Sequence, residues 1–180
     1  ISLNARVTEC EELTDVDDTG MLIGMTLTTK PEEIYRALIE ATAYGTRMII
    51  ENYREQGVEV NSFYAAGGIS QKDPMTMQIY ADILNRKIRI SRSAQSCALG
   101  AAIFGAVAAG EFGGDVCAAQ KAMTGTKDIV YKPIPENVKV YSKLFKLYMK
   151  LHDSFGVKGT SQDLSSVMKE LIAIRAAARS

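Results

Sequence analysis

Histidine, cysteine and tryptophan are scarce in this sequence. Its 180 residues contain no tryptophan, one histidine, His152, and three widely separated cysteines, Cys10, Cys97 and Cys117. With one histidine and no Cys-x-x-Cys pair, the chain offers no zinc-binding motif. An odd number of scattered cysteines is also unlike a disulfide framework and is typical of the reducing cytoplasm. We therefore expect a cytoplasmic protein without a metal site of its own.

Long apolar runs and an excess of charge of one sign are absent too. No stretch reaches the roughly 18 apolar residues that a membrane span needs. The 21 basic and 21 acidic side chains cancel, which argues against a nucleic-acid surface or a polybasic membrane patch. The first residues have neither a methionine nor the features of a signal peptide, and they predict a cut inside a longer chain. We expect neither nucleic acid nor a membrane as a partner.

The longest regular pattern predicts a helix in the first third of the chain. Residues 31–57 repeat apolar side chains at helical spacing. Thr29 and Glu32 have the spacing of a capping box, and Gly57 is suited to end the helix. The acidic side chains of this helix are predicted to be solvated rather than catalytic: Glu32, Glu33 and Glu40.

Short extended runs between the helices predict a small sheet. Residues 62–66 predict a buried, central strand, residues 87–90 a second strand and residues 128–131 an edge strand. Residues 21–27 are apolar and fit either a strand or a turn. The alternation of strands with helices favours an α/β layer with few strands.

Several further helices are predicted. Residues 96–110 form the most apolar of them, with Ala101, Gly105 and Ala109 on a flat face suited to tight packing, and we expect this helix in the core. The C-terminal part is helical, with one helix from about residue 135 and a last helix that Asp163 would cap. The remaining predicted helices span residues 74–85, with Asp73 as N-cap, and residues 115–123.

The pair Gly67-Gly68 stands where the first predicted strand should turn into a helix, in the run FYAAGGISQKDP, residues 63–74. Glycine has no Cβ, so a ligand can approach the main chain closely, and free N–H groups favour anions such as phosphate. A tight turn that needs a positive φ would explain the same glycines without a ligand. We predict that the pair lies at the carboxyl end of the strand, where open α/β sheets bind ligands.

Two motifs in this region resemble those of known kinases. The run FYAAGGIS resembles the adenosine motif of actin-like ATPases. The stretch from Gly20 to Glu40 is similar to the second signature of the FGGY carbohydrate kinases, and the run CALGAAIFGAVAAG is similar to a helix of the same family. The signature matches at every constrained position: Gly20, Leu22, Gly24, Met25, Glu33, Ile34, Ala37, Leu38, Ile39 and Glu40.

The resemblance extends roughly over residues 20–155 and implies the fold. It implies an α/β, actin-like ATPase domain of the ribonuclease H-like kind, present in part, with a small sheet packed with helices. Residues 1–155 would belong to the C-terminal nucleotide-binding domain of an FGGY kinase, and residues 156–180 would form a linker and a C-terminal helix. The Asn4-Ala5-Arg6 segment departs from the family pattern, because it is not followed by Thr-Pro.

FGGY kinases hold ATP mainly against their C-terminal domain, so the resemblance implies an ATP site in this chain. Gly67 and Gly68 would place main-chain N–H groups near the α-phosphate. Ile69, Lys72 and Asp73 would lie near the adenine and the ribose. Plainer explanations stay open for two of these residues: Lys72 as a solvated side chain, and Asp73 as the N-cap of the following helix.

The resemblance also implies what the chain lacks. The family's catalytic aspartate, first phosphate-binding loop and Mg²⁺ ligands lie upstream of the matching region, so no catalytic or metal-binding residue is assigned in this chain. Phosphoryl transfer needs the reacting oxygens in line and the charge neutralised by Mg²⁺. We therefore expect the parent protein to be an ATP-dependent kinase of a ketopentose in arabinose catabolism, and this chain alone to be inactive.

The sequence leaves several functions open. The parent could phosphorylate xylulose or glycerol, since specificity in the family lies mostly in the N-terminal domain. The chain could also be an actin-like nucleotide-binding module without kinase activity, or a helical interaction domain without a ligand. The expected partners are ATP and, in the parent, a small sugar, and a homodimer is left open.

We expect the remaining conspicuous side chains to have structural rather than catalytic roles. His152 follows an amphipathic stripe, with no serine or cysteine at a spacing that suggests a catalytic pair. The tyrosines and methionines are expected in the core or at its rim, with methionine filling gaps: Tyr44, Tyr53, Tyr64, Met75 and Met77.

Overall fold

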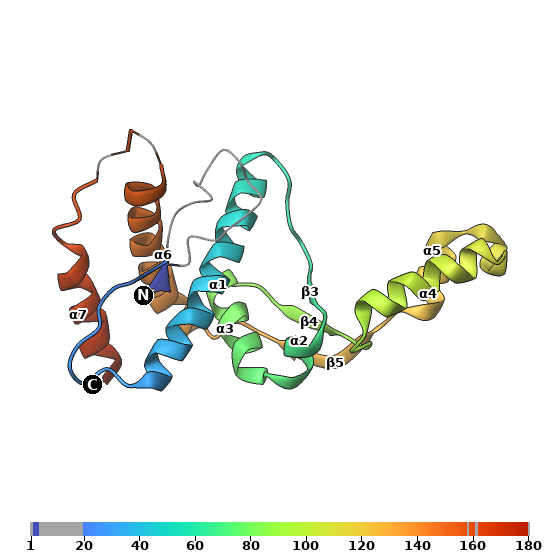
Figure 1. Cartoon of the computed structure of the whole chain (residues 1–180), viewed down its shortest axis with the longest axis horizontal. Coiled ribbons are helices and arrows are strands. Elements are labelled where there is room, and N and C mark those ends of the chain that lie inside the picture. The colour runs from blue at the N-terminus through green and yellow to red at the C-terminus, as the bar shows by residue number, and fades with distance from the viewer. Residues whose placement is uncertain (1, 4–19, 158, 161, 180) are drawn as a thin grey trace. The chain divides into compact units, whose positions relative to one another are not determined.

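The computed structural model describes residues 2–3, 20–157, 159–160 and 162–179 (Figure 1). Cys10 and the Asn4-Ala5-Arg6 segment lie outside the described residues. The chain forms two compact units. The first unit takes in the described residues up to Glu59 together with Asp82–Asn85 and Pro133 onward, and the second comprises Val60–Ala81 and Arg86–Lys132.

The first unit is mainly helical. A two-residue antiparallel ladder joins β1 (Ser2–Leu3) to β2 (Met21–Leu22), so the apolar run of residues 21–27 begins as a strand. The predicted long helices are confirmed, and Gly57 follows the first of them with a φ of 80°. The elements of this unit are β1 (Ser2–Leu3), β2 (Met21–Leu22), α1 (Pro31–Glu55), α6 (Pro135–Gly156) and α7 (Val167–Arg179).

The start of α1 differs from the predicted capping box by one residue. Lys30 precedes the helix, and its N–H donates to the Glu33 carboxylate at 2.9 Å. Thr29 does not cap the helix because its hydroxyl accepts from the Thr26 N–H at 2.8 Å. The prediction that pairs Thr29 with Glu32 is therefore wrong, although the reciprocal acidic residue of a capping box is present.

The last helix begins later than predicted. Asp163 accepts from the Ser165 N–H at 2.8 Å, but this contact closes a turn ahead of α7 rather than capping it. Leu164 consequently lies outside the helix, which starts at Val167. Two large apolar side chains of this helix, Met168 and Ile172, are exposed.

An aromatic cluster packs α1 against α6. The Tyr44 ring of α1, 1% exposed, lies 6.4 Å from Tyr141, 6.1 Å from Phe145 and 5.3 Å from Tyr148 between ring centroids. Tilted and edge-on ring pairs at these separations add to the stabilisation from apolar burial. The Tyr44 hydroxyl is itself buried and has no hydrogen-bond partner among the described residues. Tyr44 is thus a core residue, as predicted, held by apolar contact.

Glu40 is more deeply placed than predicted. Its side chain is 17% exposed, and its carboxylate accepts from the Arg36 guanidinium and the Tyr141 hydroxyl, both at 2.9 Å. Burial, and then the Glu40 charge, raises the pKa of Tyr141 to about 12. The prediction of a solvated Glu40 is wrong because α6 lies against this side of α1. Glu32 and Glu33 are exposed, as predicted.

A buried carboxylate fixes the start of α6. Asp82 belongs to the last turn of α3 (Pro74–Leu84) and is 2% exposed. One oxygen accepts from the Ile134 N–H and the other from the Asn137 side-chain amide, both at 2.8 Å. Ile134 is the residue before α6, where N–H groups lack partners within the helix and negative charge is favoured. No side chain at the start of α6 caps that helix, and the Asp82 carboxylate of α3 accepts the hydrogen bond there instead.

The second unit contains a three-stranded sheet in the order β3-β4-β5. β3 (Phe63–Ala65) runs parallel to β4 (Ile88–Ser91), and β5 (Thr126–Tyr131) runs antiparallel to it. All three predicted strands are confirmed, and β5 lies at an edge as expected. Within the described residues β3 lies at the other edge, so the prediction of a central strand is wrong. It is not fully buried either, because Tyr64 is exposed.

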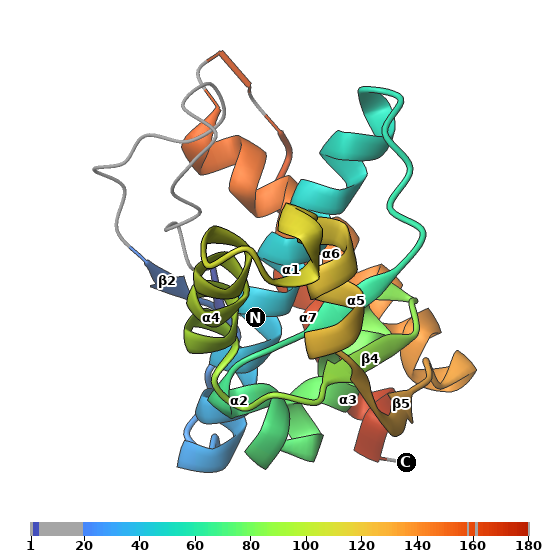
Figure 2. The ribbon, with the colours of Figure 1, turned by 90° about the vertical axis from the view of Figure 1, so that its right-hand side faces the viewer.

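The helices α3, α4 (Ser96–Ala108) and α5 (Val116–Met123) match their predicted positions, whereas the sequence did not predict α2 (Gly68–Lys72) or the 3₁₀ turn η1 (Glu111–Gly114). α4 forms as predicted, but the expectation that it lies in the core is wrong, since Ile103 is its one buried residue. Figure 2 shows α4 and α5 side by side. On α3, Met77 is buried as predicted, whereas Met75 is exposed. The elements are α2 (Gly68–Lys72), the part of α3 up to Ala81, α4 (Ser96–Ala108), the 3₁₀ turn η1 (Glu111–Gly114) and α5 (Val116–Met123).

None of the helices among the described residues could span a membrane. Each is too short or too polar to cross a bilayer.

Replacing Tyr44 by phenylalanine tests the aromatic cluster. Because the hydroxyl has no partner among the described residues, we expect the free energy of unfolding at neutral pH to stay unchanged or to rise by up to about 1 kcal/mol. Burial raises the pKa of Tyr44 far above its ordinary value of 10. The wild-type stability is therefore fully present below about pH 10 and is lost as the pH rises further. Urea titrations at about pH 7, 9 and 11 should show a smaller alkaline loss for Tyr44→Phe.

Tyr53→Phe, which removes an exposed hydroxyl from the same helix, is the matched control. It should leave the alkaline loss as in the wild type. A Tyr44→Phe variant that loses more than about 1 kcal/mol at neutral pH would mean that this hydroxyl has a partner after all.

Candidate functional site

The two glycines lie at the carboxyl end of β3, as predicted. Gly67 follows the strand and precedes α2, and Gly68 is the first residue of that helix. Apart from the adjoining backbone, a Cβ built on either glycine would meet no atom of the described residues within 4 Å. Gly68 is exposed. Bare main chain therefore faces open space at this end of the sheet.

The backbone separates the roles of the two glycines. Gly67 has φ 92° and ψ 177°, a region that is essentially restricted to glycine. Gly68 is not among the glycines with positive φ. The turn therefore requires glycine at Gly67, while at Gly68 neither the backbone nor a neighbouring atom of the described residues requires it.

Hydrogen bonds within the second unit fix the short helix after the glycines. The buried Ser70 hydroxyl donates to the Gly67 carbonyl at 2.8 Å. The Gln71 side-chain amide donates to the Ser91 carbonyl at the end of β4 at 2.5 Å. These two hydrogen bonds anchor α2 to Gly67 and to the end of β4. The main chain at Gly67 is therefore part of a hydrogen-bonded turn rather than of a loose loop.

Asp73 caps α3. Its carboxylate accepts from the Thr76 N–H at 3.1 Å and from the Thr76 hydroxyl at 2.6 Å. These hydrogen bonds, the hydroxyl first, lower the pKa of Asp73 below its ordinary value. The predicted N-cap is thus confirmed. A carboxylate has further lone pairs, so the cap leaves acceptor capacity on both oxygens.

Ile69 and Lys72 point outward from the same short helix. Ile69 is 68% exposed, and Lys72 is exposed as well. An exposed isoleucine beside open main chain offers apolar area that a planar ring could cover. The structure thus brings all five predicted residues together on one turn and one short helix, because they are nearly consecutive in the chain.

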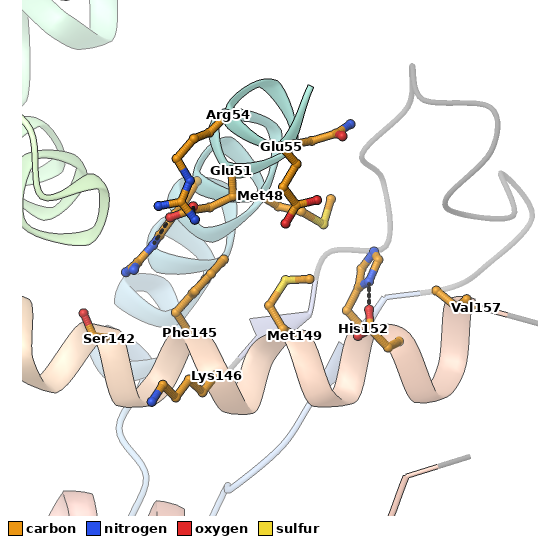
Figure 3. A pocket seen from close by; sticks show the side chains of 13 residues that line it. Met48, Glu51, Arg54, Glu55, Ser142, Phe145, Lys146, Met149, His152 and Val157 are labelled. Atoms are coloured by element: carbon orange, nitrogen blue, oxygen red, sulfur yellow. Dashed lines mark hydrogen bonds and ion pairs between the residues drawn. The ribbon is translucent and has the colours of Figure 1, made fainter. Parts of the chain in front are cut away.

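A second candidate is a cavity of about 510 Å³ in the first unit, between α1 and α6 (Figure 3). Acidic and basic side chains line it in similar numbers. Arg47 lies over the Phe145 ring, 4.3 Å from its centroid, and burial lowers the pKa of its guanidinium. The Arg54 guanidinium pairs with the Glu51 carboxylate at 2.7 Å. The acidic and basic side chains that line the cavity therefore neutralise one another, so the cavity favours neither an anionic nor a cationic ligand.

His152 lines the same cavity. It is buried, and its Nδ1 lies 3.1 Å from the Asp153 carboxylate. Ser142 lies on the same helix ten residues earlier, which corresponds to about 15 Å along the axis. Figure 3 shows the two side chains far apart along α6. No catalytic pair forms there, and the described residues hold no group of three or more histidine, cysteine or acidic side chains that could bind a metal ion.

The signature segment of residues 20–40 lies in the first unit. Gly24 takes a φ of 92°, and a Cβ there would lie 3.5 Å from the Leu171 side chain of α7. A small cavity of about 150 Å³ opens beside it, with Glu33 and Arg175 among its lining residues. The signature thus builds a helix start and its packing, and nothing in its geometry alone identifies a ligand.

Sequence comparison finds a family for this chain. The model of the C-terminal domain of the FGGY family of carbohydrate kinases matches residues 13–109. A ribulokinase of Bacillus licheniformis is 54% identical over 162 residues, which cover 88% of this chain and 28% of the relative. A ribulokinase of Halalkalibacterium halodurans is 51% identical over 166 residues, which cover 91% of this chain and 29% of the relative. The chain thus spans less than a third of these relatives.

Comparison with solved structures agrees with the family that sequence comparison finds. A xylulose kinase from Rhodospirillum rubrum matches with a TM-score of 0.64 and 26% identity, covering 78% of this chain and 28% of that chain. A ligand-bound xylulose kinase from Lactobacillus acidophilus matches with a TM-score of 0.65 and the same identity and coverage. The predicted fold class, part of an actin-like ATPase domain with a small sheet and helices, is confirmed.

Alanine substitutions separate the two glycines. Gly67→Ala should lower the free energy of unfolding by about 1–3 kcal/mol, because alanine is strained in this backbone region. Gly68→Ala should leave it unchanged or raise it by about 0.4–1 kcal/mol, because the site is open and helical. Urea unfolding followed by circular dichroism measures both. Equal losses in the two variants would show that the turn needs both glycines.

Proposed function

The chain belongs to the FGGY family of carbohydrate kinases, and we propose that it is the C-terminal, ATP-binding part of an L-ribulokinase. The full-length enzyme would transfer the γ-phosphate of ATP to L-ribulose and form L-ribulose 5-phosphate in L-arabinose catabolism. The observation that carries this proposal is the 54% identity to a ribulokinase over 88% of the chain. The xylulose kinases of known structure reach 26%.

We assign residues 1–155 to the nucleotide-binding domain and residues 156–180 to a linker and the C-terminal helix. The described part of the second unit supports this assignment, because it presents open main chain at the end of a strand. Arabinose catabolism and the two exposed, unpaired cysteines, Cys97 and Cys117, favour a cytoplasmic enzyme. A homodimer is compatible with this assignment.

The nucleotide site would be built on the glycine turn. The N–H groups of Gly67 and Gly68 would approach the α-phosphate, and the absence of a Cβ at Gly68 gives the phosphate room. Ile69 would pack on the adenine, while Lys72 and the free lone pairs of Asp73 would face the ribose. The cap on Asp73 keeps its carboxylate ionised and fixed, so it would accept hydrogen bonds from hydroxyl groups without being reorganised.

This chain would supply one wall of the phosphoryl-transfer site. Mg²⁺, when bound with ATP, neutralises charge on the phosphates and orients them for in-line attack. Its ligands and the base that deprotonates the sugar would come from the part of the kinase outside this chain. The chain's own contribution is therefore to position the nucleotide. Positioning lowers the activation barrier of phosphoryl transfer, but it does not activate the sugar hydroxyl.

A second candidate function is phosphorylation of a different sugar by the same fold. The likeness to xylulose kinases, with TM-scores of 0.64 and 0.65, supports this candidate. A glycerol kinase and a non-catalytic nucleotide-binding module are two further candidates. All of these are less well supported, because the sequence identity to ribulokinases is about twice that to the xylulose kinases.

The substrate is tested with the purified full-length protein. A coupled ADP-release assay should show ATP-dependent turnover with L-ribulose that exceeds turnover with D-xylulose or glycerol at equal concentration. The 180-residue chain alone, in the same assay, should show none. A preference for D-xylulose or glycerol would change the substrate assigned to the kinase but not the family to which it belongs. ATP-dependent turnover by the isolated chain would contradict the assignment of the base to another part of the protein.

The nucleotide site is tested by Gly68→Val in the full-length protein. A branched side chain would occupy the space assigned to the phosphate, so KM for ATP should rise at least about tenfold, which corresponds to about 1.4 kcal/mol. The Kd for the sugar should barely change, because sugar contacts are assigned to the other domain. Ala122→Val, which places the same side chain at an exposed position of α5, is the control. A folded Gly68→Val protein with unchanged ATP kinetics would remove this turn from the site.

A further inference from the structure

One ring nitrogen of His152 lacks a hydrogen-bond partner. The side chain is 8% exposed, and its Nδ1 lies 3.1 Å from the Asp153 carboxylate. Nε2 is buried and has no partner among the described residues. Buried polar atoms of folded proteins nearly always have a partner, and an atom without one destabilises the fold. An apolar ring would avoid this cost, so packing alone does not explain a histidine here.

The contact with Asp153 decides what Nε2 can bind. An ionised carboxylate has no hydrogen to donate, so Nδ1 carries the hydrogen of this contact. In the neutral imidazole the lone pair is then on Nε2. The Tyr148 ring stacks on the imidazole, with 6.3 Å between the ring centroids and 23° between the planes, and holds its orientation. Nε2 is therefore a fixed acceptor, and a group that satisfies it must donate an N–H or an O–H.

The cavity that His152 lines has the size of a small-molecule site. Its volume of about 510 Å³ lies within the roughly 300–1,000 Å³ of such sites. Figure 3 shows Phe145, Met149 and His152 extending from the same side of α6, and Met48 of α1 lines the cavity with them. Methionine side chains adapt to the shape of a ligand and make favourable contacts with aromatic rings. The apolar wall beside His152 therefore suits a planar ring.

The other side chains of the cavity favour an uncharged ligand. Glu51 lies 2.7 Å from the Arg54 guanidinium and 3.7 Å from that of Arg47. Arg47 also donates to the Ile83 carbonyl at 3.1 Å, so both guanidinium groups are already engaged. A metal ion fits poorly, because the described residues contain no cluster of histidine, cysteine and acidic side chains that could hold one.

We propose that the cavity between α1 and α6 binds an uncharged, planar aromatic molecule through a hydrogen bond to His152 Nε2. The ring of the ligand would lie against Met48, Phe145 and Met149, and its N–H or O–H would donate to Nε2. All of these residues belong to the first unit, whereas the glycine turn belongs to the second. The proposal does not rest on the kinase assignment, and sugar turnover is measured separately.

Indole and benzofuran are the probes, because they have the same shape and only indole carries a donor. His152 is the single histidine of the chain, so histidine-selective ¹⁵N labelling of the 180-residue chain yields the two ring nitrogens of one residue. At pH 8 the free chain should show the hydrogen on Nδ1. Indole should shift the Nε2 resonance with a Kd below about 1 mM and should bind at least about tenfold more tightly than benzofuran. A hydrogen on Nε2 in the free chain, or equal affinities for the two probes, would overturn the proposal.

His152→Phe tests the acceptor. Phenylalanine keeps a ring to stack on Tyr148, and Asp153, whose side chain is 34% exposed, can turn to water. Indole and benzofuran should then bind equally. Ser142→Ala, which removes a hydroxyl from the same cavity, is the matched control and should leave the preference for indole unchanged.

Calorimetry on the full-length protein should give the same preference for indole and its loss in His152→Phe. A preference that survives in His152→Phe would place the hydrogen bond elsewhere and contradict the proposal. A full-length protein that binds neither probe at 1 mM would contradict it as well, because the cavity would then be closed to ligands.

Discussion

The buried Asp82 carboxylate is the contact on which the first unit depends. It accepts from the Ile134 N–H and from the Asn137 amide, so it fixes where α6 begins. The position of α6 then decides which of its rings reach Tyr44 on α1. Breaking one partner would leave a buried charge or a buried donor unsatisfied, which costs more than an ordinary hydrogen bond contributes. The apolar cluster packs α1 against α6, and the Asp82 carboxylate fixes where α6 begins.

The glycine pair shows how one motif can have two causes. At Gly67 the backbone angles alone require glycine, so the turn explains it completely. At Gly68 the φ is not positive and the space is open, so neither backbone strain nor crowding by the described residues explains the absence of a side chain. The proposed nucleotide site would give a reason, because a ligand there would approach the main chain closely. The sequence does not reveal this difference, because two adjacent glycines carry no information on their backbone φ angles.

Local pattern was enough to predict most of the helices and strands. Periodicity located α1, α3, α4, α5 and α6, and the Asp73 cap followed from a short polar residue before a proline. The capping of α1 was missed by one residue because the Thr29 hydroxyl is engaged by Thr26. Glu40 was misplaced because its partner Tyr141 lies 101 residues later in the chain. Contacts between distant segments leave no local signal, and the five site residues were located by resemblance to a family rather than by their own spacing.

The remaining errors share one direction, which has a physical meaning. β3 was expected at the centre of a sheet and lies at its edge, and α4 was expected in the core and is largely exposed. Apolar patterning records the burial of each residue in the complete protein, since that is the state in which its side chains are packed. This chain covers 28% of the length of a ribulokinase with which it shares 54% identity. Among the described residues, β3 and α4 are thus less covered than their apolar sequences predict. The misplaced Glu40 differs in kind, because the helix that covers it lies within this chain.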